Sequence, residues 1–220
     1  MPDMEKRLEA FVRVGHGVVV FPGGVGTAEE ILYLLGVLMH PDNERQPMPV
    51  IMTGPESSEA YFRRIDDFVG ATLGEEAQRR YNIIIDDPGE VARQSLAGLD
   101  AVHEFRQTNG DAYYFNWRLK IEADFQRPFA ATHDAMRKLE IDEDQPAHEL
   151  AANLRRAFSG IVSGNVREDT AALVEEHGPF EVQGSERIMG LLDDLLASFV
   201  EQKRMKINAG AYVPCYRVTR

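Results

Sequence analysis

Residues 22–30 combine a glycine turn with polar side chains in an order that suits phosphate binding. The stretch reads Pro-Gly-Gly-Val-Gly-Thr-Ala-Glu-Glu, follows the apolar run 18–21 and precedes the apolar segment 31–39, which predicts a strand, a turn and a helix. Glycines let the backbone approach a ligand closely, and the N-terminus of a helix favours negative charge. The spacing matches neither a dinucleotide-binding turn nor a Walker loop, because no Gly-Lys-Ser/Thr follows. It therefore indicates the phosphate of a mononucleotide.

Thr27 and Glu30 admit two interpretations. Thr-x-x-Glu at the start of a helix is the pattern of a capping box, in which each side chain bonds an N–H group that lacks a helical acceptor. Spacing alone favours this structural role. The functional hypothesis is that a carboxylate facing a bound phosphate feels a like charge, which raises its pKa and lets it exchange protons near neutral pH. The two roles are compatible.

Arg7 lies at the border of the apolar stripe of the first predicted helix, one turn from both Met4 and Phe11. On the pattern alone, its commonest role is that of a solvated arginine whose stem covers apolar neighbours.

The chain shows no signature of metal or thiol chemistry. No His, Cys and carboxylate residues cluster at metal-ligand spacing, so we expect no metal site. The single cysteine, Cys215, lies in an apolar and aromatic segment and is predicted to be in the core. One cysteine also excludes an internal disulfide and fits the reducing environment of the cytoplasm.

Composition narrows the class of partner. The chain has 220 residues, 44% of them hydrophobic, and a formal net charge of −12. Nucleic-acid-binding proteins normally present a basic face, so we expect no nucleic-acid partner. No apolar run approaches the length that spans a membrane, and the first residues have no apolar signal core.

The first half alternates helices with short apolar strands. Helical spacing predicts helices over about the first fifteen residues, 27–39, about 60–69 and from Pro88, and apolar runs predict strands at 18–21, 50–52 and 83–85. This alternation indicates an α/β fold with a parallel, Rossmann-like sheet. Three strands are few for a doubly wound sheet, so we expect a partial one that lacks its first half.

The pattern changes after residues 109–111. Apolar and charged residues alternate at 117–121, which predicts a strand with one solvent-exposed face. The spacing of apolar residues over 150–161 and 188–199 predicts two amphipathic helices. Pro214 suggests that 212–218 forms an edge strand. We therefore divide the chain into a Rossmann-like part, residues 1–108, and a smaller α+β module, residues 109–220.

Two motifs together carry a family resemblance. Pro-Gly-Gly-x-Gly-Thr-x-x-Glu at 22–30 and Met-x-x-Arg at 4–7 resemble the LONELY GUY family of phosphoribohydrolases, long mislabelled as lysine decarboxylases. Leu8 stands where that family usually has lysine. Residues 115–117, 150–160 and 214–216 extend the resemblance to the C-terminal half of the long bacterial nucleotide 5′-monophosphate nucleosidases.

The resemblance implies hydrolysis of the N-glycosidic bond of a nucleoside 5′-monophosphate, giving a free base and ribose 5-phosphate. Glu30 and Arg7 would be catalytic, and Gly23, Gly24, Gly26 and Thr27 would bind the phosphate. No cofactor is implied. We expect a homo-oligomer, and after the nucleotide substrate the second partner that we consider is a regulatory nucleotide. The alternative is a non-catalytic nucleotide-binding protein or an inactive fragment. A pyridoxal-dependent decarboxylase is disfavoured because no lysine belongs to the glycine-turn constellation.

Overall fold

The computed structural model describes residues 3–205 and 212–219. The first half alternates helices and strands as the sequence predicts. Its helices are α1 (Met4–Val14), α2 (Val25–Leu38), α3 (Glu59–Leu73), α4 (Glu75–Gln78) and α5 (Pro88–Thr108), with the 3-10 turns η1 (Pro41–Asn43) and η2 (Glu56–Ser58). Its strands are β1 (Val18–Val20), β2 (Val50–Gly54) and β3 (Asn82–Ile85).

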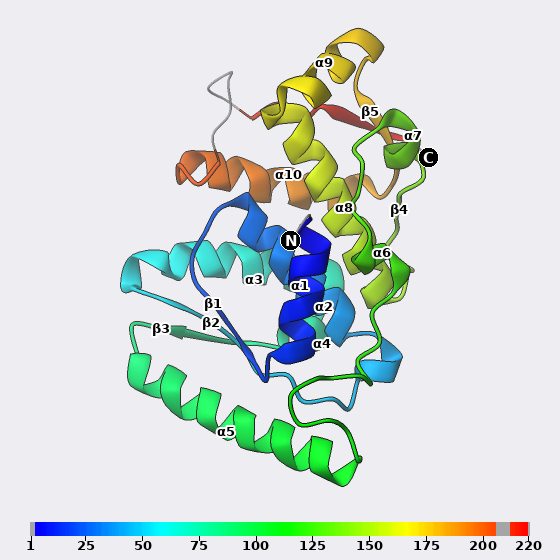
Figure 1. Cartoon of the computed structure of the whole chain (residues 1–220). Helices are drawn as coiled ribbons and strands as arrows, with labels where there is room; N and C mark the ends of the chain where they lie inside the picture. Colours follow the sequence, from blue (N-terminus) through cyan, green and yellow to red (C-terminus); the bar gives the residue numbers. More distant parts are fainter. Residues whose placement is uncertain (1–2, 206–211, 220) are drawn as a thin grey trace.

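These three strands form a parallel sheet in the order β1-β2-β3, with Val18 opposite Val50 and Ile51 opposite Asn82. The two crossovers run through α2 and α3, and crossovers of one hand place both helices on the same face of a sheet. Figure 1 shows α2 and α3 on that face and α5 on the other. The predicted α/β class with a parallel sheet is therefore confirmed, and helices cover both faces of this sheet.

The second half adds helices and a second parallel sheet. Its helices are α6 (Ala123–Gln126), α7 (His133–Arg137), α8 (Ala147–Val166), α9 (Glu168–His177) and α10 (Glu186–Glu201). The strands β4 (Glu140–Ile141), β5 (Phe180–Gly184) and β6 (Tyr216–Thr219) pair in the order β4-β5-β6. The two amphipathic helices predicted here correspond to α8 and α10. The predicted closing strand is β6, and it does lie at an edge of its sheet.

The strand predicted at 117–121 is wrong. Leu119 and Ile121 are buried as the alternation requires, but Trp117 is exposed and the segment pairs with no strand in the described structure. Its backbone bonds asparagine side chains instead. Asn43 accepts from the Lys120 N–H at 2.8 Å and donates to the Lys120 carbonyl at 2.7 Å, and thus satisfies the groups that a strand would have paired.

The two halves share one apolar core. Helix α8 packs along α2, and α10 packs on α3, so the second half covers the side of these helices that faces away from the first sheet (Figure 1). Residues Ile31 to Leu38 of α2 are all buried as a result. The division at residues 108 and 109 stays a prediction, although α5 does end at Thr108. Among the described residues, no helix has the length and apolar character needed to cross a membrane.

Strand β1 is an edge of the first sheet, and apolar side chains surround this edge. Phe11, Val14, Val19 and Phe21 are 55%, 51%, 39% and 65% exposed, respectively. The outer edge of β1 pairs with no strand among the described residues, and such an edge beside exposed apolar side chains is a template for association.

We therefore expect the chain by itself to self-associate or aggregate. Sedimentation velocity over a range of concentrations measures this directly. A charged substitution at the edge, Val19→Lys, should shift the protein toward monomer, whereas Leu96→Lys on the outer face of α5 should not. A wild-type chain that stays monomeric at every concentration would contradict the expectation.

Candidate functional site

The glycine turn lies where β1 ends and α2 begins, as the sequence predicts, but the helix begins earlier than expected. Its first residue is Val25, Gly24 is the N-cap, and the cap makes no side-chain hydrogen bond. Thr27 is therefore the third residue of the helix, inside its first turn. The capping-box interpretation of Thr27 and Glu30 is wrong, because it requires Thr27 to be the N-cap and Glu30 the third residue of the helix, whereas Gly24 is the N-cap and Glu30 is the sixth residue.

Close approaches explain two of the glycines. A Cβ atom on Gly23 would collide with Oγ1 of Thr27, and one on Gly24 would collide with the carbonyl oxygen of Arg204. A Cβ atom on Gly26 would meet nothing within 4 Å, so the start of α2 is open to an incoming group. The first N–H groups of a helix have no helical acceptor, and an anion placed here meets them and the positive end of the helix dipole.

Arg7 and Glu30 form an ion pair that joins α1 to α2. Nη2 of Arg7 donates to Oε1 of Glu30 at 2.7 Å, and the side chains are 48% and 34% exposed. Arg7 is thus paired with a specific carboxylate, and the solvated role favoured by the helix pattern alone is incomplete. A pair this exposed stabilises a fold little, by about 0–1 kcal/mol.

A groove of about 400 Å³ lies beside this pair. Thr27 and Glu30 contribute the polar side chains of its lining, and apolar residues of α1, β1 and α2 make up most of the rest. Few polar groups converging on a mostly apolar concavity are typical of small-molecule sites. The structure therefore brings together three of the six predicted site residues, Arg7, Thr27 and Glu30, beside the turn that holds the three glycines.

Two residues that the sequence did not single out also meet the turn. Tyr61 of α3 is buried, and its hydroxyl donates to the carbonyl of Gly24 at 3.4 Å. Burial is the main cause that raises the pKa of this hydroxyl, so it stays protonated. Arg204, which follows α10, donates from Nη1 to the carbonyl of Gly23 at 2.9 Å.

A buried charge cluster lies behind the Arg7–Glu30 pair. Arg155 of α8 is 0% exposed and donates from Nη1 to Glu5 at 2.9 Å and to Glu29 at 3.4 Å. Burial raises the pKa of Glu29 to about 7, and the nearby Arg155 charge opposes this shift only in part. Each carboxylate neighbours a site residue, because Glu5 precedes Arg7 by one half turn of α1 and Glu29 directly precedes Glu30.

This cluster had a signal in the sequence. Arg155 falls on the apolar stripe formed by Ala151, Leu154 and Phe158, and Glu5 falls on the stripe of Leu8 and Val12. A charge on a stripe that faces the core must find a partner there. Arg204 and Tyr61 carry no such signal, because a single arginine after a helix and a single aromatic residue within one are common.

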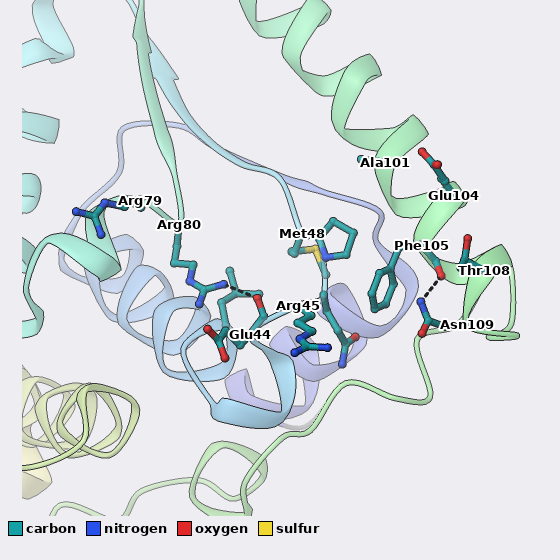
Figure 2. Close-up of a pocket in the computed structure, with 13 residues that line it drawn as sticks. Glu44, Arg45, Met48, Arg79, Arg80, Ala101, Glu104, Phe105, Thr108 and Asn109 are labelled. Carbon is teal, nitrogen blue, oxygen red and sulfur yellow. Dashed lines mark hydrogen bonds between the residues drawn. The ribbon is translucent and has the colours of Figure 1, made fainter.

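A second cavity, of about 570 Å³, lies between the end of α5 and the segments that precede β2 and β3 (Figure 2). Arg45, Arg79 and Arg80 contribute to its lining. Arg79 pairs with Glu75 at 2.9 Å, and Arg80 pairs with Glu76 at 3.7 Å. This cavity is at the amino ends of the strands, whereas the glycine turn is at the carboxyl end of β1, where ligands of open α/β sheets bind.

Strand, glycine turn and helix N-terminus, with an ion pair beside them, define the class as an α/β protein with a glycine turn at the start of a helix. Comparison with known proteins makes the class specific. Residues 99–219, more than half of the chain, match the family described as pyrimidine/purine nucleotide monophosphate nucleosidase, C-terminal. The chain belongs to this family. Residues 1–95 match a second family, described as possible lysine decarboxylase.

Curated relatives agree with this assignment. The pyrimidine/purine nucleotide 5′-monophosphate nucleosidases of Escherichia coli strain K12 and of Escherichia coli O157:H7 are each 56% identical to this chain over 218 residues. The match covers 99% of this chain and 48% of each relative. The chain thus spans about half the length of the curated relatives it matches.

Proposed function

We propose that the chain carries the catalytic turn of a nucleotide 5′-monophosphate nucleosidase, which hydrolyses the N-glycosidic bond to a free base and ribose 5-phosphate. The observation that carries the proposal is the 2.7 Å contact between Arg7 and Glu30 beside the glycine turn. The family match and the names of the relatives support the same reaction.

The phosphate would lie at the start of α2. Gly23 and Gly24 keep the turn narrow, Gly26 leaves the approach open, and the side chain of Thr27 lies at the same turn. Backbone N–H groups and the helix dipole would offset the phosphate charge in an otherwise acidic protein. With the phosphate held here, the ribose extends along the groove toward Glu30.

Glu30 would act on the sugar. Cleavage of the N-glycosidic bond builds positive charge on the anomeric carbon, as in glycoside hydrolysis, while the bonding electrons leave with the base. A carboxylate next to this carbon stabilises the cation and orients the water that adds to it, and the base takes up a proton. Arg7 would hold the Glu30 carboxylate in place and bond the substrate through its other N–H groups. Water is the co-substrate, and no redox cofactor is implied.

The partners follow from the same reaction. We propose a nucleoside 5′-monophosphate as substrate, a cytoplasmic setting and a homo-oligomeric active form, and a regulatory nucleotide stays a prediction. A non-catalytic nucleotide-binding protein is the second candidate. The observation that favours it is the open edge of β1, because the residues that line the groove beside Glu30 all come from α1, β1, α2 and the turns between them.

Arg7→Ala tests the proposed function. The chain is joined to the N-terminal half that its relatives carry, and ribose 5-phosphate is measured after incubation with AMP, GMP and pyrimidine monophosphates. We expect release by the wild-type protein and loss of most turnover in Arg7→Ala. The melting temperature should change little, because the ion pair is half exposed.

Arg64→Ala, on an exposed position of α3, is the matched control and should retain wild-type rates. Nucleotide binding without ribose 5-phosphate release by the joined protein would favour the second candidate. Wild-type rates in Arg7→Ala would show that Arg7 is a solvated surface residue with no part in turnover.

A further inference from the structure

We propose that Arg204 binds the 5′-phosphate of the substrate, so that the C-terminal half completes the site at the glycine turn. This inference rests on the proposed function and adds to it a residue that lies far from the glycine motif in the sequence. The C-terminal half would then have a direct part in substrate recognition.

The chain turns sharply after α10 to bring Arg204 to the site. Lys203 has a φ of 56°, in the left-handed region that non-glycine residues adopt rarely. The Arg204 N–H then donates to the Phe199 carbonyl at 2.7 Å, which fixes the backbone against the end of α10. The Arg204 carbonyl lies against Gly24, so this segment touches the turn with its backbone as well as its side chain.

Tyr61 holds the guanidinium of Arg204 in place. The guanidinium carbon lies 4.5 Å from the centre of the Tyr61 ring, within the range of a cation–π contact. Tyr61 is 1% exposed, so the ring is a fixed platform. The Tyr61 hydroxyl donates to the Gly24 carbonyl, so one buried side chain contacts both the Arg204 guanidinium and the glycine turn.

The charge of Arg204 is available for a ligand. Within residues 3–205 and 212–219, its guanidinium donates to the Gly23 carbonyl and pairs with no carboxylate. Arg7 and Arg155, by contrast, are both committed to glutamates. A guanidinium offers several N–H donors in a planar fork that suits phosphate oxygens. With one donor on Gly23, the others remain for an anion at the start of α2.

Binding to AMP and adenosine tests this inference, because the two ligands differ only in the phosphate. Isothermal titration calorimetry on the 220-residue chain compares wild type, Arg204→Gln and Arg204→Lys. We expect wild type to bind AMP more tightly than adenosine. Arg204→Gln should weaken AMP binding on the order of 10- to 100-fold and leave adenosine binding unchanged. Arg204→Lys should retain part of the preference, since it keeps the charge but not the fork.

Arg45→Gln, in the cavity of Figure 2, is the matched control and should behave as wild type. Equal losses for AMP and adenosine in Arg204→Gln would assign Arg204 a structural role and overturn the proposal. An unchanged AMP affinity in Arg204→Gln, or a wild type that does not prefer AMP, would also overturn it. Binding of AMP that depends on Arg204, without hydrolysis by the joined protein, would refute the proposed function alone.

Discussion

Glu30→Gln is expected to abolish release of the base from nucleoside monophosphates while leaving the fold intact. Glutamine keeps the shape of the side chain but removes the charge that offsets the developing cation, so we expect a loss of several orders of magnitude in rate. Stability should barely change, because Glu30 is not a helix cap and its pair with Arg7 is about half exposed. Base release and melting temperature are measured together, in the chain joined to the N-terminal half of a relative.

Glu75→Gln, an exposed glutamate in an ion pair on α4, is the control for the loss of one such pair and should leave the rate unchanged. Rates within a few-fold of wild type in Glu30→Gln would show that the catalytic carboxylate lies elsewhere. Glu29 would be the next candidate from the sequence, but the structure buries it against Arg155. Such a result would therefore question the site as a whole.

Arg155→Met is expected to destabilise the protein by about 3–5 kcal/mol, which is typical of removing one partner from a buried ion pair. Glu5 and Glu29 would keep their burial and lose the guanidinium that both contact. The free energy of unfolding is measured by urea titration. The triple variant Glu5→Gln, Glu29→Gln and Arg155→Met should recover most of the loss, because it leaves no buried charge.

The loss in Arg155→Met should be larger at pH 8 than at pH 5. The pKa of Glu29 is raised to about 7, so the protonated form is favoured in the folded state. The shift adds to the free energy of unfolding. This contribution is fully present below about pH 4.5, the pKa of Glu29 in the unfolded chain, and is lost as the pH rises through 7. At pH 8 the ionised Glu29 needs Arg155, whereas at pH 5 it is largely neutral. Arg64→Met is the exposed control and should lose little stability. A loss of less than about 1 kcal/mol in Arg155→Met at both pH values would contradict the expectation.

Helices and strands could be predicted from the sequence where a single hydrophobic pattern determines them. Apolar runs of three or four residues gave the three strands of the first sheet, and helical spacing gave α1, α3, α8 and α10 to within a few residues. These patterns are reliable because burial of one stripe or one run fixes the local structure. The alternation at 117–121 misled because burial of Leu119 and Ile121 needs only an extended chain, while a strand also needs a partner for its N–H and C=O groups.

The sequence by itself determined the turn, the position of Glu30 on α2 and of Arg7 on α1, and the family. These depend on residues close together in the chain or on motifs in a fixed order. Tertiary structure decided that Arg7 bonds Glu30, that Gly24 rather than Thr27 caps α2, and that Arg155 joins Glu5 and Glu29. It also decided that Arg204 reaches Gly23 across 181 residues. Contacts of this kind depend on how α8 and α10 pack against α2 and α3, and no local pattern encodes the distance between two such helices.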